Sequence, residues 1–142
     1  MRWKRYWVVF AFALSMLSCS KEATVTGSVF YRERMAMPPN AIVEVSLIDV
    51  SRADAKAVLL ARLTIDEPGQ VPVAFALSYD PSLIDERNTY QVQARILVDG
   101  RLAWISTTAH LVITRGNPSK VDVLVQRVPS PAAKNGDDVP VD

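Results

Sequence analysis

Apolar and polar residues alternate with a period of two through most of the chain between residues 24 and 128, and turn-forming residues interrupt the alternation about every ten residues. A period of two places successive side chains on opposite faces of a β-strand. The pattern predicts strands over residues 24–32, 42–50, 57–65, 71–79, 90–98, 101–104, 110–113 and 121–125. Seven or eight short antiparallel strands without a long helix favour an all-β fold, a two-sheet β-sandwich, with a small β-barrel as the alternative.

Three local motifs refine this prediction. Asp99-Gly100 is the strongest hairpin signal, because both residues tolerate the positive φ of a two-residue turn. Asp80-Pro81 predicts a helical turn with Asp80 as its N-cap. Pro72 lacks a backbone N–H, so the strand that it opens is expected at a sheet edge. In the predicted strand over residues 57–65, alternation predicts one shared inward face. Its residues are Leu59, Ala61, Leu63 and Ile65.

The N-terminal residues have the pattern of an export signal. Basic residues at the start precede an apolar run over residues 6–17, and Ser18 then precedes Cys19, the single cysteine of the chain. This order resembles a bacterial lipobox, although Met16 and Leu17 replace its usual Leu and small residue. We expect cleavage before Cys19 and lipid attachment there; an ordinary cleaved signal peptide and a retained anchor are the alternatives. About a dozen apolar residues are fewer than the roughly 20 that span a bilayer, which disfavours the anchor.

Position 20 is Ser, whereas an Asp immediately after the lipidated cysteine is the usual signal for inner-membrane retention. The expected location is therefore the outer membrane, lipid-anchored and facing the periplasm. The predicted organisation is a signal peptide over residues 1–18, a tether over 19–23, a β-sandwich domain over 24–128 and a disordered tail over 129–142. The tail is rich in Pro, Ala and Asp and lacks an apolar period, so it cannot offset the entropy of ordering.

Composition narrows the function classes. Three of the 16 Lys and Arg residues precede Cys19 and none of the 15 Asp and Glu residues do, so 13 basic and 15 acidic residues remain after cleavage, a net charge of −2. A nearly neutral domain offers no electrostatic surface for nucleic acid. Lipidation of the only cysteine also leaves no disulfide and no thiolate metal ligand.

The sequence gives little sign of catalysis. His110 is the only histidine and has no acidic residue near it in sequence, so a catalytic triad is not expected. The carboxylate pairs Asp49 with Asp54 and Asp66 with Glu67 are typical of solvated loops, and Asp137-Asp138 lies in the predicted tail. We predict no enzyme activity, no cofactor and no metal site.

Apolar residues that alternation leaves on the outside are the candidate binding surface. A structural role in bulges or covered faces is the competing interpretation. These residues are Phe30, Ile48, Leu60, Leu97 and Ile105. Met35 and Met37, beside Pro38-Pro39, would add adaptable apolar contacts.

Several segments in order carry a family resemblance. They are Val25-Thr26-Gly27-Ser28-Val29-Phe30-Tyr31-Arg32-Glu33-Arg34, Met37-Pro38-Pro39-Asn40-Ala41, residues 47–54, Tyr79-Asp80-Pro81 and Thr114-Arg115-Gly116-Asn117-Pro118. Together they resemble the YbaY/YscW family of bacterial lipoproteins over roughly residues 24–128. The resemblance implies a small β-sandwich lipoprotein of the outer membrane with its lipid at Cys19. In the YscW branch it implies a pilotin, a chaperone that escorts a secretin to the outer membrane; the motifs look closer to the YbaY branch, which has no settled biochemical role.

The resulting functional prediction is a non-enzymatic outer-membrane lipoprotein that acts as a pilotin-like chaperone or assembly factor for a client such as a secretin. The alternative is an envelope lipoprotein that binds a small ligand or a cell-envelope polymer. Two interpretations stay open for the charged motif residues: a polar network that fixes turns, or a ligand site at one end of the sandwich. These residues are Arg32, Arg34, Arg52, Asp54 and Asp80.

Overall fold

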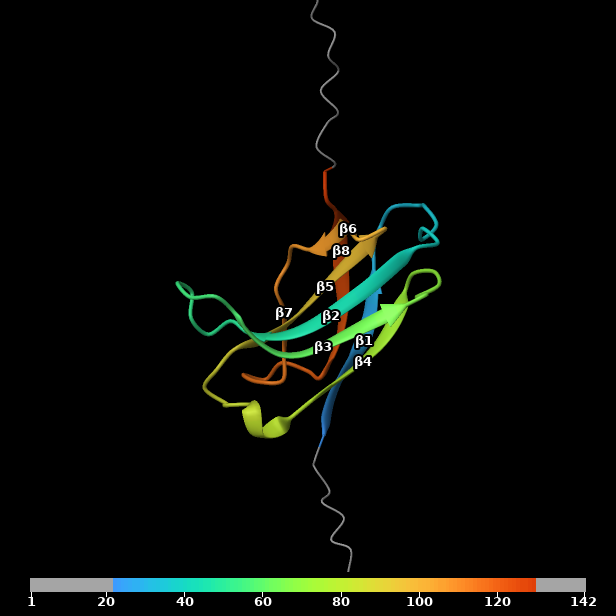
Figure 1. The fold of residues 1–142 in the computed structure, drawn as a ribbon. Helices are drawn as coiled ribbons and strands as arrows, with labels where there is room; N and C mark the ends of the chain where they lie inside the picture. The colour runs from blue at the N-terminus through green and yellow to red at the C-terminus, as the bar shows by residue number, and fades with distance from the viewer. Residues whose placement is uncertain (1–21, 130–142) are drawn as a thin grey trace, which may run out of the picture.

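The structure is a computed structural model that describes residues 22–129. Within these residues, eight strands and one short 3-10 helix follow each other (Figure 1). They are β1 (Ala23–Phe30), β2 (Ala41–Asp49), β3 (Val58–Asp66), β4 (Val73–Tyr79), η1 (Pro81–Leu83), β5 (Tyr90–Val98), β6 (Arg101–Ser106), β7 (His110–Val112) and β8 (Lys120–Arg127). The predicted all-β class and the number of strands are confirmed.

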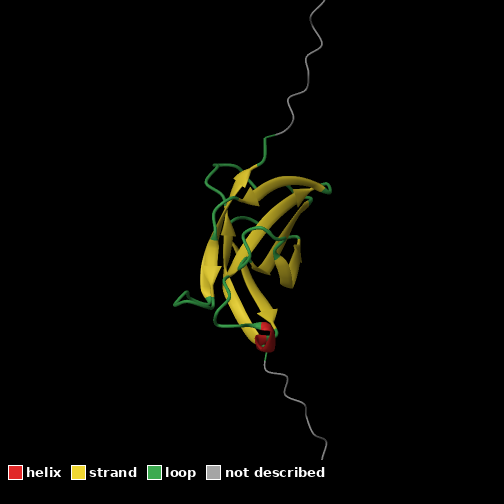
Figure 2. Cartoon of the chain, turned by 90° about the vertical axis from the view of Figure 1, so that its left-hand side faces the viewer, coloured by secondary structure: helices red, strands yellow, loops and turns green. Residues whose placement is uncertain are grey.

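The strands form one continuous sheet in the order β3-β2-β5-β6-β8-β1-β4, and β7 pairs with β5 beside this path. The two layers expected of a sandwich are joined where β6 pairs with β8. The sheet therefore curls around a single core into a nearly closed barrel (Figure 2). One pair departs from the predicted antiparallel arrangement, because β1 and β8 run parallel. These two strands stand at opposite ends of the chain, so no hairpin constrains their direction.

The local turn predictions are confirmed. Asp99 and Gly100 have φ values of 52° and 76°, as a two-residue hairpin requires. The Asp80 side chain accepts a hydrogen bond from the Ser82 N–H and caps η1, with Pro81 at the first helical position. β4 is an edge strand, as Pro72 predicted.

The inward faces of the strands form the hydrophobic core. In β4 the alternation is complete, since each odd-numbered residue from Val73 to Tyr79 is buried and each residue between them is exposed. Trp104 is the largest fully buried side chain, at 2% exposed. Its ring stacks on Tyr31 with 5.1 Å between the ring centroids and 15° between the planes. The Tyr31 hydroxyl donates to the Met35 carbonyl at 2.8 Å, which ties the loop after β1 to this stack.

The described chain enters and leaves the domain at opposite ends (Figure 1). Ala23, at the start of β1, pairs with Tyr79, at the end of β4. We call the end that holds Glu22, Tyr79 and η1 the N-terminal pole. No helix within residues 22–129 is long and apolar enough to cross a membrane. The predicted signal peptide, Cys19 and residues 130–142 lie outside the described residues.

Candidate functional site

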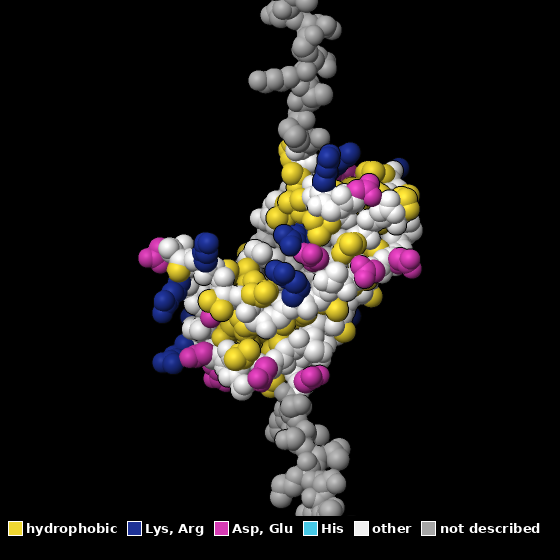
Figure 3. Space-filling model, in the orientation of Figure 1, with side chains coloured by type: hydrophobic (Ala, Val, Ile, Leu, Met, Phe, Trp, Pro, Cys, Tyr) yellow, Lys and Arg dark blue, Asp and Glu magenta, His cyan; other side chains and the backbone are white. Residues whose placement is uncertain are grey.

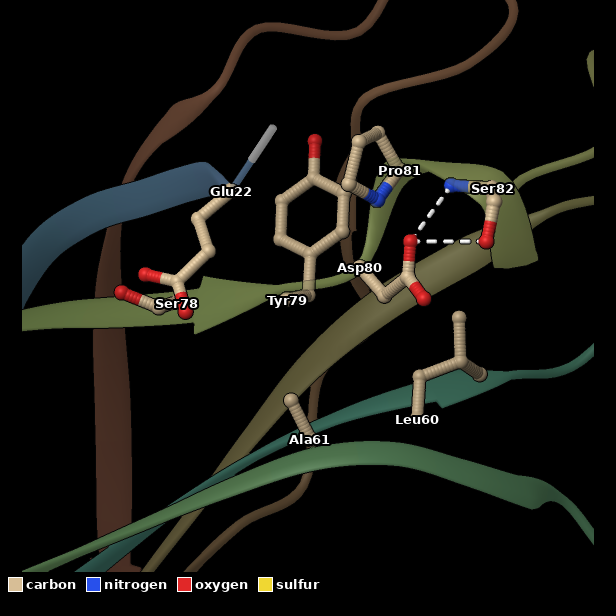
Figure 4. Close-up of a pocket in the computed structure, with 8 residues that line it drawn as sticks. All are labelled: Glu22, Leu60, Ala61, Ser78, Tyr79, Asp80, Pro81 and Ser82. Atoms are coloured by element: carbon tan, nitrogen blue, oxygen red, sulfur yellow. Dashed lines mark hydrogen bonds between the residues drawn. The ribbon is translucent and has the colours of Figure 1, made fainter. Parts of the chain in front are cut away.

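The candidate site is the cleft where the barrel fails to close. β3 and β4 are the two edge strands of the sheet; they lie close together near the turn that joins them and diverge toward the N-terminal pole (Figure 1). A hollow of about 560 Å³ opens between them. Its lining residues are Glu22, Leu60, Ala61, Ser78, Tyr79, Asp80, Pro81 and Ser82 (Figure 4).

A β-bulge sets the β3 side of the cleft. Leu47 of β2 pairs with Ala61 and Ile48 pairs with Leu59, so Leu60 has no partner in the register. An extra residue in one strand breaks the alternation of side chains. Leu60 and Ala61 therefore both line the cleft, and both point from β3 toward the end of β4 (Figure 4).

The bulge corrects one sequence prediction. Leu59 was expected on the inward face with Ala61, but it is 48% exposed and lies on the outer face of the sheet. Leu60, counted as outward, is half-buried and packs against the core. Period-two counting fails here because a bulge changes which residues share a face.

The opposite wall of the cleft is held by the cap of η1. Asp80 accepts hydrogen bonds from the Ser82 N–H at 2.9 Å and from the Ser82 hydroxyl at 2.7 Å, both at Oδ1. These two hydrogen bonds hold the pKa of Asp80 below its ordinary value, so its carboxylate is ionised at neutral pH. Tyr79 is buried beside it, and burial raises the pKa of its phenol. The wall is thus an aromatic ring bordered by a fixed negative charge.

A second, smaller hollow of about 320 Å³ lies on the outer face of the sheet over β2, β3, β5 and β6. Arg95 forms an ion pair with Glu44 across the β2–β5 ladder, and Arg62 also lines the hollow. Apolar side chains of Ile48 and Leu59 adjoin these charges. Figure 3, which views the molecule as Figure 1 does, shows basic, acidic and hydrophobic side chains interspersed on this side of the molecule.

The predicted outward apolar residues are largely covered. Ile48 is 7% exposed, and Phe30, Leu60 and Leu97 are half-buried. Ile105, at 37%, is the most exposed of the five. The two methionines differ in exposure: Met37 is buried in the core, whereas Met35 is exposed. Of this set, only Leu60 lines the larger cleft.

His110 and Asp49, two of the residues considered for catalysis, have separate hydrogen-bond partners. His110 lies on β7 and is half-buried; burial lowers its pKa, and a hydrogen bond with the Leu124 backbone partly offsets this effect. Asp49 accepts hydrogen bonds from Ser51 and from Asn88, which fix the loops after β2 and before β5. Burial raises the pKa of Asp49, but these hydrogen bonds and nearby Arg52 outweigh it and lower the pKa. Within residues 22–129, no group of three or more His, Cys, Asp or Glu side chains is placed to hold a metal ion.

Arg32, Arg34 and Asp80 are divided between the two ends of the domain, and Arg52 and Asp54 lie in the loop between β2 and β3. Arg32 and Arg34 follow the C-terminal end of β1, whereas Asp80 follows β4, whose end pairs with the start of β1. Because β1 and β4 are antiparallel, the arginines lie at the pole opposite Asp80. The structure therefore does not assemble these residues into one polar network, although Asp80 fixes a turn as the structural interpretation expects.

The fold and the cleft define a class: a small all-β domain with an open cleft between its edge strands β3 and β4. Comparisons with known proteins identify the family of the chain. Residues 20–125 match the family model of the type III secretion system lipoprotein chaperone YscW. The chain belongs to this family.

Two relatives are informative. The chain is 33% identical over 120 residues to the uncharacterized lipoprotein YbaY of Escherichia coli K12, covering 82% of this chain but 63% of that relative's length. The structure is similar to that of an alternative pilotin from the type II secretion system of Vibrio cholerae, with a TM-score of 0.75 and 43% identity. That match covers 78% of this chain and all of the pilotin chain.

Proposed function

We propose that this protein is an outer-membrane lipoprotein, anchored through acylated Cys19 and facing the periplasm, that acts without catalysis as a pilotin-like chaperone or assembly factor. Its client would be an outer-membrane protein such as a secretin. The observation that carries the proposal is the cleft between β3 and β4, in a chain that belongs to a lipoprotein chaperone family. The similarity of the structure to that of a pilotin supports the same function.

The cleft has the chemistry of a site for a polypeptide segment. Leu60, Ala61 and Tyr79 give it an apolar floor. The edges of β3 and β4 that face each other carry no ladder between them within residues 22–129, so their main-chain groups are free to accept a partner. A client segment laid in the cleft would cover apolar surface and satisfy these groups together.

The position of the cleft suits a client at a membrane. Glu22 lines the cleft and stands three residues after Cys19 in sequence. Three extended residues span roughly 10 Å, so a lipid on Cys19 would keep the mouth of the cleft close to the bilayer surface. The anchor would fix the location of the client, and the cleft would hold it until it inserts.

An affinity pull-down from detergent-solubilised envelopes, followed by mass spectrometry, tests the proposal. The bait is the acylated protein, compared with Cys19→Ala and with Ala61→Arg, which places a charge in the cleft. Thr64→Arg is the matched control, because Thr64 lies on the same strand but is exposed and does not line the cleft. We expect an outer-membrane protein to be enriched by the wild type and by Thr64→Arg, to be lost with Ala61→Arg, and to be mislocalised in cells that carry Cys19→Ala. Recovery that is equal for both arginine variants would contradict a client site in the cleft.

A second candidate is binding of a small ligand or a cell-envelope polymer. The hollow on the outer face favours it, because Arg62, Arg95 and Gln93 offer hydrogen-bond donors beside apolar surface. A screen of glycans and lipids against wild type and Arg62→Gln decides this candidate. A ligand whose affinity falls with that substitution supports it, and the absence of any ligand rejects it.

A further inference from the structure

We propose that the cleft between β3 and β4 selects a client segment that is apolar along its length and carries Lys or Arg at the end that meets Glu22 and Asp80. This inference rests on the proposed chaperone function and names the chemistry of its partner. It follows from the charge of the lining residues and from what a bound segment would do to them.

The lining charges have one sign. Among the eight residues around the cleft, Glu22 and Asp80 are acidic and none is Lys or Arg. No ion pair within residues 22–129 engages either carboxylate; the ion pairs there are Arg87 with Asp85 and Arg95 with Glu44. Asp80 uses Oδ1 for both of its hydrogen bonds with Ser82. The cleft therefore presents negative charge to whatever occupies it.

The two acidic residues lie at the mouth of the cleft. Glu22 directly precedes β1, and Asp80 directly follows β4; these strands pair at Ala23 and Tyr79. In Figure 4 both side chains lie near the Tyr79 ring, and Leu60 and Ala61 face them from β3. The β3 side of the cleft is thus apolar, and the negative charge lies on the β4 side, next to the Tyr79 ring.

Occupation of the cleft would remove water from these carboxylates. Desolvating a carboxylate without a partner is costly, whereas a cation at the same place recovers the lost solvation through an ion pair. A client carboxylate would instead be repelled. Among segments with equal apolar surface, those with a basic residue at the mouth should therefore bind most tightly.

The outer hollow does not share this preference. It contains Arg62 and the Arg95–Glu44 pair, so its local charge is mixed. The two surfaces differ enough in charge for one experiment to separate them. A preference for basic residues that depends on Glu22 and Asp80 can arise only in the cleft.

A peptide library tests the inference with the full-length acylated protein in non-ionic detergent micelles. The probes are 16-residue peptides with varied apolar interiors and flanking positions drawn from Lys, Glu and Ser. The variant Glu22→Gln with Asp80→Asn removes both charges and keeps an N-cap acceptor at position 80. The variant Glu33→Gln with Asp99→Asn removes the same number and types of charge from the opposite pole and serves as the matched control. Peptides that bind the wild type but not Ala61→Arg are the ones that bind in the cleft.

Among peptides whose binding Ala61→Arg abolishes, we expect Lys flanks to be enriched about three- to tenfold over Glu flanks, since exposed ion pairs contribute modestly. The enrichment should approach one for the Glu22→Gln, Asp80→Asn variant, persist in the control variant, and diminish at high salt. Equal frequencies of Lys and Glu among those peptides would overturn the inference and leave the cleft as a client site. If Ala61→Arg abolishes the binding of no peptide in the library, both this inference and the client site in the cleft are overturned.

Discussion

The Val121 carbonyl of β8 occupies the space into which a Cβ atom on Gly27 of β1 would project. A Cβ there would overlap the carbonyl oxygen, lie 2.7 Å from the Val121 carbonyl carbon and lie 3.2 Å from the Phe75 ring. Glycine in the middle of a strand often marks such a close approach of two backbones. Gly27 therefore permits the parallel pairing of β1 with β8, through which β1 and β4 are connected to the rest of the sheet.

We expect Gly27→Ala to destabilise the domain by about 3 kcal/mol or more, because the overlapping atoms are backbone and cannot rotate away. Gly69→Ala is the control: Gly69 has φ +73° with open space around it, so only the conformational cost of about 1 kcal/mol applies. Urea unfolding followed by circular dichroism measures both. Equal losses in the two variants would show that the contact with Val121 is not the cause.

The Tyr31–Trp104 stack is expected to dominate packing at the pole opposite the cleft. Trp104→Ala should cost about 3–5 kcal/mol, the range for removing a large buried aromatic side chain. Tyr31→Phe keeps the stacked ring and loses only the hydrogen bond with the Met35 carbonyl, so it should cost about 1 kcal/mol. Equilibrium unfolding of the two variants tests the ranking. A larger loss from Tyr31→Phe would place the stabilisation in the hydroxyl and not in the stack.

His110 is expected to make the domain less stable at mildly acidic pH. Burial lowers the pKa of folded His110 below 6.5, so the unfolded chain takes up its proton first as the pH falls. The stabilisation from neutral His110 is complete above pH 6.5 and is lost as the pH falls from there through the lowered folded-state pKa. Asp49 and Asp80 have lowered pKa values, and that of Asp85 is about 2, so these carboxylates do not titrate in that window.

Urea midpoints at pH 7.5 and pH 5.5, for wild type and His110→Gln, check this prediction. The wild type should lose more stability than the variant between the two values. A loss of the same size in both proteins would assign the pH dependence to other groups.

The sequence predicts features that depend on neighbouring residues. Asp99-Gly100 specifies its turn because both residues adopt positive φ, and Asp80-Pro81 specifies a capped helical turn because cap and first residue are adjacent. Pro72 also marks β4 as an edge, since a missing donor is a local property. These predictions needed no knowledge of the rest of the fold.

The sequence does not predict features that depend on residues far apart along the chain. The parallel pairing of β1 with β8 joins segments about 95 residues apart, and alternation carries no information on which strands become neighbours. The bulge at Leu60 follows from the register between β2 and β3, so a period-two count put Leu59 and Leu60 on the wrong faces. Leu60 was a candidate because of its apolar character, and only the fold places it in a cleft with Glu22 and Asp80.

Site-specific photo-crosslinking in cells tests most directly the claim that the cleft holds an outer-membrane client. A photoreactive amino acid replaces Ala61 in the cleft or, as a control, Thr64 on the exposed face of the same strand. We expect an adduct with one outer-membrane protein from position 61, identified by mass spectrometry, and no such adduct from position 64. Absence of an adduct at position 61, or the same adduct from both positions, would contradict a client site in the cleft.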